Sequence, residues 1–159
     1  MLAETSAEAA TRFGSAPAFV TDEGLTLSYA EFDALADEAA VGLAELGVGE
    51  GDVVSLLLPS VPEHFVAYVA AARLGALTAA VNPKLVQAER AAVLRAANPL
   101  VVVTTEELAP TNPDAPFTTV LIEPARRADA VMDGVRRARE RPEPLAGDAD
   151  RPIAIVFTS

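Results

Sequence analysis

The residues best placed for chemistry are two hydroxyl side chains, Thr158 and Ser159, which follow the apolar run RPIAIVF at the end of the sequence. An apolar run of this kind predicts a buried β-strand. In a parallel α/β sheet, the loop that leaves the carboxyl end of a strand is where phosphates and other ligands bind. Hydroxyl groups and free backbone N–H groups there can donate hydrogen bonds to phosphate oxygens. Thr158 and Ser159 are therefore candidate phosphate-binding residues, although a plain strand-to-loop transition would look the same.

The glycine-rich stretch GVGEGD, residues 47–52, resembles a nucleotide-binding loop only at first sight. A dinucleotide fingerprint has the spacing G-x-G-x-x-G and joins a strand to the start of a helix. Here the glycines stand at positions 47, 49 and 51, between a predicted helix and a predicted strand. We therefore interpret GVGEGD as a helix cap and a turn.

His64 is the only histidine, and it stands beside Glu63 in the first turn of a predicted helix. The sequence places no Ser or Asp partner beside it, so an ordinary histidine is favoured over a general base. The other acidic pairs are expected to be solvated, since none is predicted in an apolar setting that would raise its pKa. These pairs are Asp22/Glu23, Asp33/Asp37 and Glu106/Glu107. The sequence alone thus assigns no catalytic residue and no metal ligand.

Arginines are concentrated near the end of the chain, where six of the eleven lie between Arg126 and Arg141. Such a cluster could bind anions, but acidic residues are interspersed with the arginines. A solvated helix with ion pairs inside the helix is the favoured interpretation. We therefore expect residues 123–151 to form a surface helix and a linker.

The elements that would position these residues alternate between helical and strand periodicity. Ser28 and Glu31 form an S-x-x-E capping box, which predicts a helix from there to Gly47. Asn82-Pro83 is interpreted as a strand exit, because proline cannot continue the strand. Strands are predicted at 53–58, 76–81, 100–104, in FTTVLIE and in the final run, helices at 61–74 and 86–97, and a hairpin in AFVTDEGLTLSY. This order predicts an α/β fold, a layered and mostly parallel sheet with flanking helices and a short N-terminal hairpin.

Composition excludes several classes of protein. Hydrophobic residues make up 51% of the 159 residues and charged residues 22%, which is typical of a globular domain and not of a disordered chain. The net charge of −11 disfavours nucleic acid or an anionic membrane surface as a partner. The absence of cysteine excludes disulfides and thiolate metal sites and fits a cytoplasmic protein. No apolar run is long enough for a transmembrane segment, and MLAETSAEAATRFG lacks the apolar core of a signal peptide.

Three stretches carry a resemblance to a known family. They are LTLSYAEFDALADEAAVGLAELGVGEGDVVSLLLPSVPEHFVAYVAAARLGALTAAVNPKL, ANPLVVVTTEEL and DADRPIAIVFTS. In content and order they resemble the N-terminal part of the adenylate-forming enzymes, which include AMP-forming acyl-CoA synthetases, nonribosomal peptide adenylation domains and beetle luciferase. The acyl-CoA synthetases, of the fatty-acid-CoA ligase type, look closest. The match begins near Pro17 and spans nearly the whole chain, apart from the generic stretch 117–144.

The resemblance implies a site and a reaction. In the family the last strand runs into a phosphate loop of the form TSGTTG-x-PKG, so Thr158 and Ser159 align with its first two positions and are implied to bind ATP. The family reaction has two steps. A carboxylate attacks the α-phosphate of ATP, with Mg²⁺, to give an acyl-adenylate, and a thiol such as CoA then displaces AMP. The rest of the loop, the acyl pocket and the family's catalytic lysine have no counterpart in these residues.

The resemblance therefore implies that residues 1–159 are the first α/β subdomain of a larger AMP-binding domain, truncated at the start of the phosphate-binding loop and inactive alone. A carboxylic acid, such as a fatty acid, is the implied substrate of the parent enzyme. The alternative is a non-catalytic truncated module that associates with another chain. An isolated subdomain is expected to expose apolar surface and to self-associate, so a monodisperse monomer that binds no hydrophobic dye would count against it. A flavodoxin-like binding domain is a third interpretation, which rests on fold analogy alone.

Overall fold

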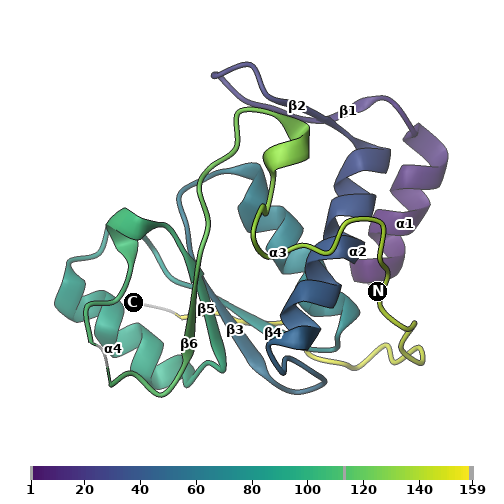
Figure 1. Ribbon diagram of the computed structural model, residues 1–159. Coiled ribbons are helices and arrows are strands. Elements are labelled where there is room, and N and C mark those ends of the chain that lie inside the picture. Colours follow the sequence, from purple (N-terminus) through teal and green to yellow (C-terminus); the bar gives the residue numbers. More distant parts are fainter. Residues whose placement is uncertain (1, 113, 158–159) are drawn as a thin grey trace.

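The computed structural model of the protein describes residues 2–112 and 114–157. In chain order its elements are α1 (Leu2–Phe13), β1 (Pro17–Val20), β2 (Thr26–Ser28), α2 (Tyr29–Glu45), β3 (Val53–Leu57), α3 (Pro62–Arg73), β4 (Leu77–Ala80), α4 (Gln87–Ala97), β5 (Val101–Thr104), the 3₁₀ turn η1 (Glu106–Leu108), β6 (Thr118–Leu121), the 3₁₀ turn η2 (Ala128–Ala130) and β7 (Ala154–Ile155). The α/β fold and the N-terminal hairpin predicted from the sequence are confirmed (Figure 1). The first helix, α1, is an addition that the sequence analysis did not assign.

The main sheet has five strands in the order β6-β5-β3-β4-β7. Every neighbouring pair is parallel, and β3 lies at the centre, where Val54 is in register with Thr78 of β4 and Val101 of β5. β1 and β2 pair separately as an antiparallel hairpin. β3 and β5 are rich in branched and aliphatic residues, which favours a position inside the sheet where both faces of the strand are covered. Because the strands are parallel, all of their carboxyl ends meet at one edge of the sheet, called here the carboxyl edge.

Helices cover both faces of the sheet. On one face α2 and α3 pack over the main core, to which Val54 and Leu56 contribute, whereas on the other face Leu94 of α4 packs with Leu57 and Val102. Figure 1 shows α1, α2 and α3 together on one side of the sheet and α4 on the other. Contacts to α1, α2, β3 and β4 surround α3, which explains why its sequence is apolar nearly all round.

The predicted ends of α2 are confirmed in detail. The Ser28 hydroxyl accepts the Glu31 N–H at 3.2 Å, and the Glu31 carboxylate accepts the Ser28 N–H at 2.8 Å. At the other end, Gly47 has φ +91°, a left-handed conformation that glycine adopts without strain. The Asp52 carboxylate accepts the Gly49 N–H at 2.8 Å, which closes the turn into β3. GVGEGD is therefore a cap and a turn, as predicted.

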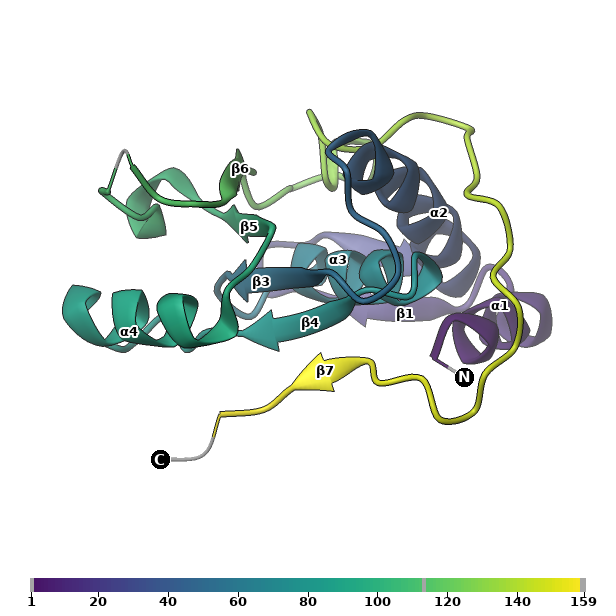
Figure 2. The ribbon, with the colours of Figure 1, turned by 90° about the horizontal axis from the view of Figure 1, so that it is seen from below.

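The arginine-rich segment is not the surface helix that the sequence predicted. Between β6 and β7 the one helical element is the short 3₁₀ turn η2, and the chain otherwise runs through turns and irregular segments as a strap, defined here as residues 122–153. Figure 2 shows the strap crossing over α2 from one edge of the sheet to the other. Its buried residues, Ile122, Val131, Met132 and Val135, join the main core. Because these apolar residues belong to the core that α2 covers, the strap follows the surface of that helix instead of forming one.

Ion pairs of the strap also differ from the prediction, because three of the six found among the described residues reach α2 and none is internal to an α-helix. Arg136 binds Glu38 at 2.6 Å, and Arg137 binds Glu45 at 2.5 Å. The Glu38 carboxylate also accepts the Arg139 N–H at 2.7 Å. These contacts hold the strap against the polar side of α2, so the acidic residues there have partners far along the chain.

β7 is not the buried strand that its apolar sequence predicted. It is two residues long and forms the outer edge of the sheet beside β4 (Figure 2). Val156 is 80% exposed and Phe157 38% exposed. The physical reason is that no described element covers the outer side of β7.

Within the described residues, no helix combines the length and the apolar character that crossing a membrane requires.

Candidate functional site

The two candidate phosphate-binding residues, Thr158 and Ser159, lie outside the described residues. The structure does describe the strand that leads to them. β7 runs parallel to β4, with Ala154 opposite Thr78. The chain therefore leaves β7, through Val156 and Phe157, on the carboxyl edge of the sheet, where the sequence analysis expected ligands to bind.

The carboxyl edge contains a topological switch point between β3 and β5. After β3 the chain runs through α3 to β4 on one side, and after β5 it runs through η1 to β6 on the other side. In open α/β sheets, ligands bind where neighbouring strands diverge in this way. The Asn82 side chain, just after β4, accepts the Lys84 N–H at 2.9 Å and shapes this exit. Lys84 is the only lysine in the sequence, and it is exposed at this edge.

Glu63, also at the carboxyl edge, is a carboxyl group whose environment the sequence analysis missed. It lies in the first turn of α3 and is completely buried. One carboxyl oxygen accepts the Ala125 N–H at 2.6 Å, and the other has no hydrogen-bond partner among the described residues. Burial raises the pKa of Glu63, and hydrogen bonds from Ala125 and from its own N–H oppose that shift. Its place on a helix that is apolar nearly all round was the signal that could have identified it.

His64, next to it, is partly buried, and burial lowers its pKa. Its ring centroid lies 5.6 Å from that of Phe65. No hydrogen bond between the His64 ring and a carboxylate or a hydroxyl group is found among the described residues. The geometry that would orient a general base is therefore not present in this part of the chain.

A hollow of about 600 Å³ opens beside the exits of β5 and β6. Its lining includes Glu106 after β5, Ile122 after β6 and Ala125. The Glu63 contact to Ala125 fixes this part of the strap against the start of α3. The hollow thus lies on the carboxyl edge, near the switch point.

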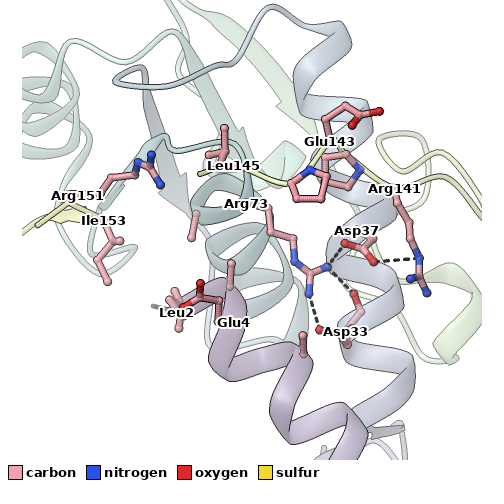
Figure 3. Close-up of a pocket in the computed structure, with 15 residues that line it drawn as sticks. Leu2, Glu4, Asp33, Asp37, Arg73, Arg141, Glu143, Leu145, Arg151 and Ile153 are labelled. Carbon is pink, nitrogen blue, oxygen red and sulfur yellow. Dashed lines mark hydrogen bonds and ion pairs between the residues drawn. The ribbon is translucent and has the colours of Figure 1, made fainter. Parts of the chain in front are cut away.

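A second hollow, of about 370 Å³, lies among α1, α2, the end of α3 and the strap (Figure 3). Its central group is Arg73, whose side chain is 8% exposed. Arg73 forms ion pairs with Asp33 and, at 2.5 Å, with Asp37. The Ser6 hydroxyl of α1 donates to Asp33 at 2.9 Å. The prediction that Asp33 and Asp37 are simply solvated is wrong, because a buried arginine 36 to 40 residues away in sequence binds them.

This second hollow has a structural role in our interpretation. Arg73 is the last residue of α3, and Ile153 precedes β7, so the hollow lies toward the amino ends of the strands, away from the carboxyl edge. Burial raises the pKa of Asp37, while the charges of Arg73 and Arg141 oppose the shift. Figure 3 shows Arg73 and Arg141 both directed at Asp37. The charged groups of this hollow form ion pairs with one another, and these contacts hold α1, α2 and α3 together.

Metal ligands are not gathered in the part of the chain that the structure describes. No group of three or more His, Asp or Glu side chains is arranged there to hold a metal ion. We therefore assign no magnesium ligand to the described residues.

Comparison with known proteins identifies the family. The family model described as "AMP-binding enzyme" matches residues 6–159. The chain belongs to the AMP-binding enzyme family. A relative in this family, 4-coumarate–CoA ligase 3 of Oryza sativa subsp. japonica, is 35% identical over 140 residues, which are 86% of this chain and 25% of that ligase.

Solved structures of the AMP-binding family share the fold. The N-terminal domain of FACL13 from Mycobacterium tuberculosis superposes with a TM-score of 0.84 at 26% identity, covering 99% of this chain and 41% of that one. A fatty acyl CoA synthetase of the same organism gives a TM-score of 0.83 at 27% identity, covering 99% of this chain and 32% of that one. The resemblance to AMP-forming CoA ligases is therefore confirmed. The chain spans about a quarter of the length of the rice ligase that it matches.

Proposed function

We propose that this chain is the first nucleotide-binding subdomain of an AMP-forming acyl-CoA synthetase, and that Thr158 and Ser159 begin its ATP phosphate-binding loop. The observation that carries the proposal is the position of β7. This strand lies next to β4 in the parallel sheet, so the residues that precede Thr158 leave the sheet at its carboxyl edge. Membership of the AMP-binding family supports the same assignment.

The chemistry requires donors at this edge. In adenylate formation, a carboxylate oxygen forms a bond to the α-phosphorus of ATP while the bond to pyrophosphate breaks. The two hydroxyl groups would donate hydrogen bonds to phosphate oxygens and hold the leaving pyrophosphate in place. Mg²⁺, when bound, offsets phosphate charge. In the second step a thiol such as CoA attacks the acyl carbonyl carbon, and AMP leaves.

The proposed substrate is a carboxylic acid, such as the fatty acid that the sequence resemblance implies. The relatives reported above are named for 4-coumarate and for fatty acyl groups. These acids differ in the acyl group and share the carboxylate, which is the part that reacts. We propose CoA as the thiol acceptor and the cytoplasm as the compartment, the latter because the sequence has no cysteine to require oxidation.

The chain alone is proposed to be inactive, because the family's catalytic lysine and acyl pocket are not among its residues. The competing proposal, a non-catalytic module that associates with another chain, is favoured by one observation. Exposed apolar residues, including Val156 and Phe157, follow the edge strand β7.

The test is a Thr158→Ala/Ser159→Ala double variant in the longer enzyme that we propose contains this chain. Each lost hydrogen bond to a charged phosphate should cost about 1.5–3 kcal/mol of ATP binding or transition-state stabilisation. The matched control is Thr118→Ala/Thr119→Ala, which removes two exposed hydroxyl groups from β6 at the opposite edge of the sheet. Adenylation kinetics that are the same in both double variants would overturn the assignment.

A further inference from the structure

A groove runs between α4 and the part of the chain that joins β5 to β6, which Figure 1 shows beside that helix. Two hollows form it, of about 160 Å³ and about 80 Å³. Both hollows are lined by Ala91 and Leu94 of α4 and by Pro110 and Asn112 from the opposite wall. Because they share these four residues, the two hollows are continuous, and together they are called here the α4 groove.

The charged side chains that line the α4 groove are both cationic. Arg90 lines the smaller hollow and Arg95 the larger one, and no acidic residue lines either. Seven of the eleven arginines form ion pairs within the described residues, but Arg90 and Arg95 form none there. The whole chain has 23 acidic and 12 basic residues, so two unpaired guanidinium groups without a carboxylate are a local departure from its charge. The α4 groove is therefore complementary to an acidic partner.

The floor of the α4 groove is apolar, and its two walls are joined. Leu57 is 1% exposed and Leu94 3% exposed, and Phe117 packs against the same small core. At one end the Gln87 amide donates to the Thr111 hydroxyl at 2.6 Å, which links α4 to the opposite wall. A groove that is formed before binding loses less conformational entropy when a partner docks.

The size of the two hollows favours separate side chains over one enclosed small molecule. Pockets for small molecules usually measure about 300–1,000 Å³, and both hollows are smaller. A cavity of about 150 Å³ accommodates a benzene ring, so the larger hollow matches one large apolar side chain. Arg90 and Arg95 are about 7.5 Å apart along the axis of α4, so carboxylates on one short peptide can reach both.

We propose that the α4 groove is a docking site for an acidic peptide segment of a partner protein, with one large apolar side chain in the larger hollow and carboxylates at Arg90 and Arg95. The net charge of −11 repels such a segment at long range. At physiological salt the screening length is about 8 Å, so the two arginines in direct contact decide the local attraction. This inference concerns a partner and does not depend on the proposed enzymatic function.

The test is fluorescence anisotropy of labelled peptides with the 159-residue chain at about 0.15 M NaCl. The probe is the peptide Glu-Asp-Glu-Phe-Glu-Asp-Glu, and two control peptides replace its Phe by Ala or all of its acidic residues by Lys. We expect the probe to bind, and each replacement to raise its dissociation constant about tenfold or more. Arg90→Glu/Arg95→Glu should weaken probe binding to a similar extent. The matched control, Arg12→Glu/Arg126→Glu, makes the same change in net charge at exposed arginines outside the groove and should leave binding unchanged.

Ala91→Phe provides a second, independent variant, because it fills the groove without changing any charge. Ala91 is exposed and lines both hollows, whereas its neighbour Ala92 is exposed and lines neither of them. Ala91→Phe should weaken probe binding about tenfold or more, and Ala92→Phe should not. Circular dichroism on each variant checks that it is folded.

Three results would overturn the proposal. The first is no binding of the probe, and the second is equal binding of the probe by the Ala91→Phe and Ala92→Phe variants. The third is equal binding of the Phe and Ala peptides, which would show a diffuse attraction between charges with no apolar anchor. Binding of phenylacetate as tight as that of the probe would contradict a peptide partner and indicate a small carboxylate as the ligand.

Discussion

Gly42 provides a test of how the strap is held against α2. Gly42 lies inside α2, is buried, and its backbone is not in the left-handed region. Helix propensity alone predicts that Gly42→Ala should stabilise the protein, by roughly 0.5–1 kcal/mol. The position of the strap against α2 predicts a loss of stability instead. A Cβ atom at this position would lie 1.8 Å from the Val135 carbonyl oxygen and 2.7 Å from its carbon.

The magnitude follows from how far the strap must retreat. Ordinary contacts of a Cβ atom begin at 3.4 Å, so the backbone at Val135 must move by roughly 1.5 Å or more. Overpacking of this kind costs about 1–3 kcal/mol. The same movement strains two hydrogen bonds to Glu38, from the N–H groups of Arg137 at 2.9 Å and Arg139 at 2.7 Å, each contributing about 1 kcal/mol. After the propensity gain is subtracted, we expect a net loss of about 2–4.5 kcal/mol.

Chemical denaturation of Gly42→Ala and of an Ala44→Gly control would measure this loss. Ala44 is exposed in the same helix, so Ala44→Gly reports the propensity difference alone, about 0.5–1 kcal/mol. Amide exchange at Arg137 and Arg139 should become faster in Gly42→Ala and stay unchanged in the control. If Gly42→Ala instead gains about as much stability as the control loses, the close approach of the strap to α2 is wrong.

Three further predictions concern the core and the buried charges. Leu57→Ala should lower the free energy of unfolding by about 2–5 kcal/mol, because Leu57 is 1% exposed in the core under α4; thermal denaturation that is unchanged would contradict this. Arg73→Met should cost about 3–5 kcal/mol, because Asp33 and Asp37 lose their buried partner, and adding Asp33→Asn and Asp37→Asn should recover part of the loss in urea unfolding. Burial raises the pKa of Glu63, so its contribution to stability is complete below the unfolded pKa near 4.5 and is lost as pH rises through the folded value. Glu63→Gln keeps the backbone hydrogen bond without the charge, so it should be more stable than the wild type at neutral pH and remove this part of the pH dependence; parallel unfolding curves against pH for the two proteins would argue against a buried acid.

Local sequence signals were sufficient for most of the fold. The Ser28 and Glu31 capping box marks the start of α2, and the continuous apolar run of β3 indicates a strand buried on both faces. These features depend on neighbours within a few residues. The pairing of Asp33 with Arg73 depends on two helices meeting in space, which local periodicity does not encode.

The strap and β7 were predicted wrongly for related reasons. The charge pattern of the arginine-rich segment fits a solvated helix, but burial of Val131 and Met132 against the core decides its path. The apolar sequence of β7 predicts a buried strand, but β7 lies at the edge of the sheet, so it is exposed.

The position of the strand before the candidate site was predictable. The sequence predicts a last strand that leads to the candidate residues Thr158 and Ser159, which lie outside the described residues, and the parallel sheet brings that strand to the carboxyl edge beside β4. The hydrogen bond that Glu63 accepts was not predictable from the residues around it, because the Ala125 N–H that donates it lies 62 residues away.

The most direct test of the proposed function is carboxylate-dependent exchange of labelled pyrophosphate into ATP, measured on the longer enzyme that we propose contains this chain and on the 159-residue chain alone. Adenylate formation is reversible, so a ligase returns labelled pyrophosphate to ATP only when a carboxylic acid is present. We predict exchange by the longer enzyme that depends on the carboxylic acid, and none by the 159-residue chain. Failure of the longer enzyme to catalyse exchange with any of a panel of fatty and aromatic acids would contradict the proposed function.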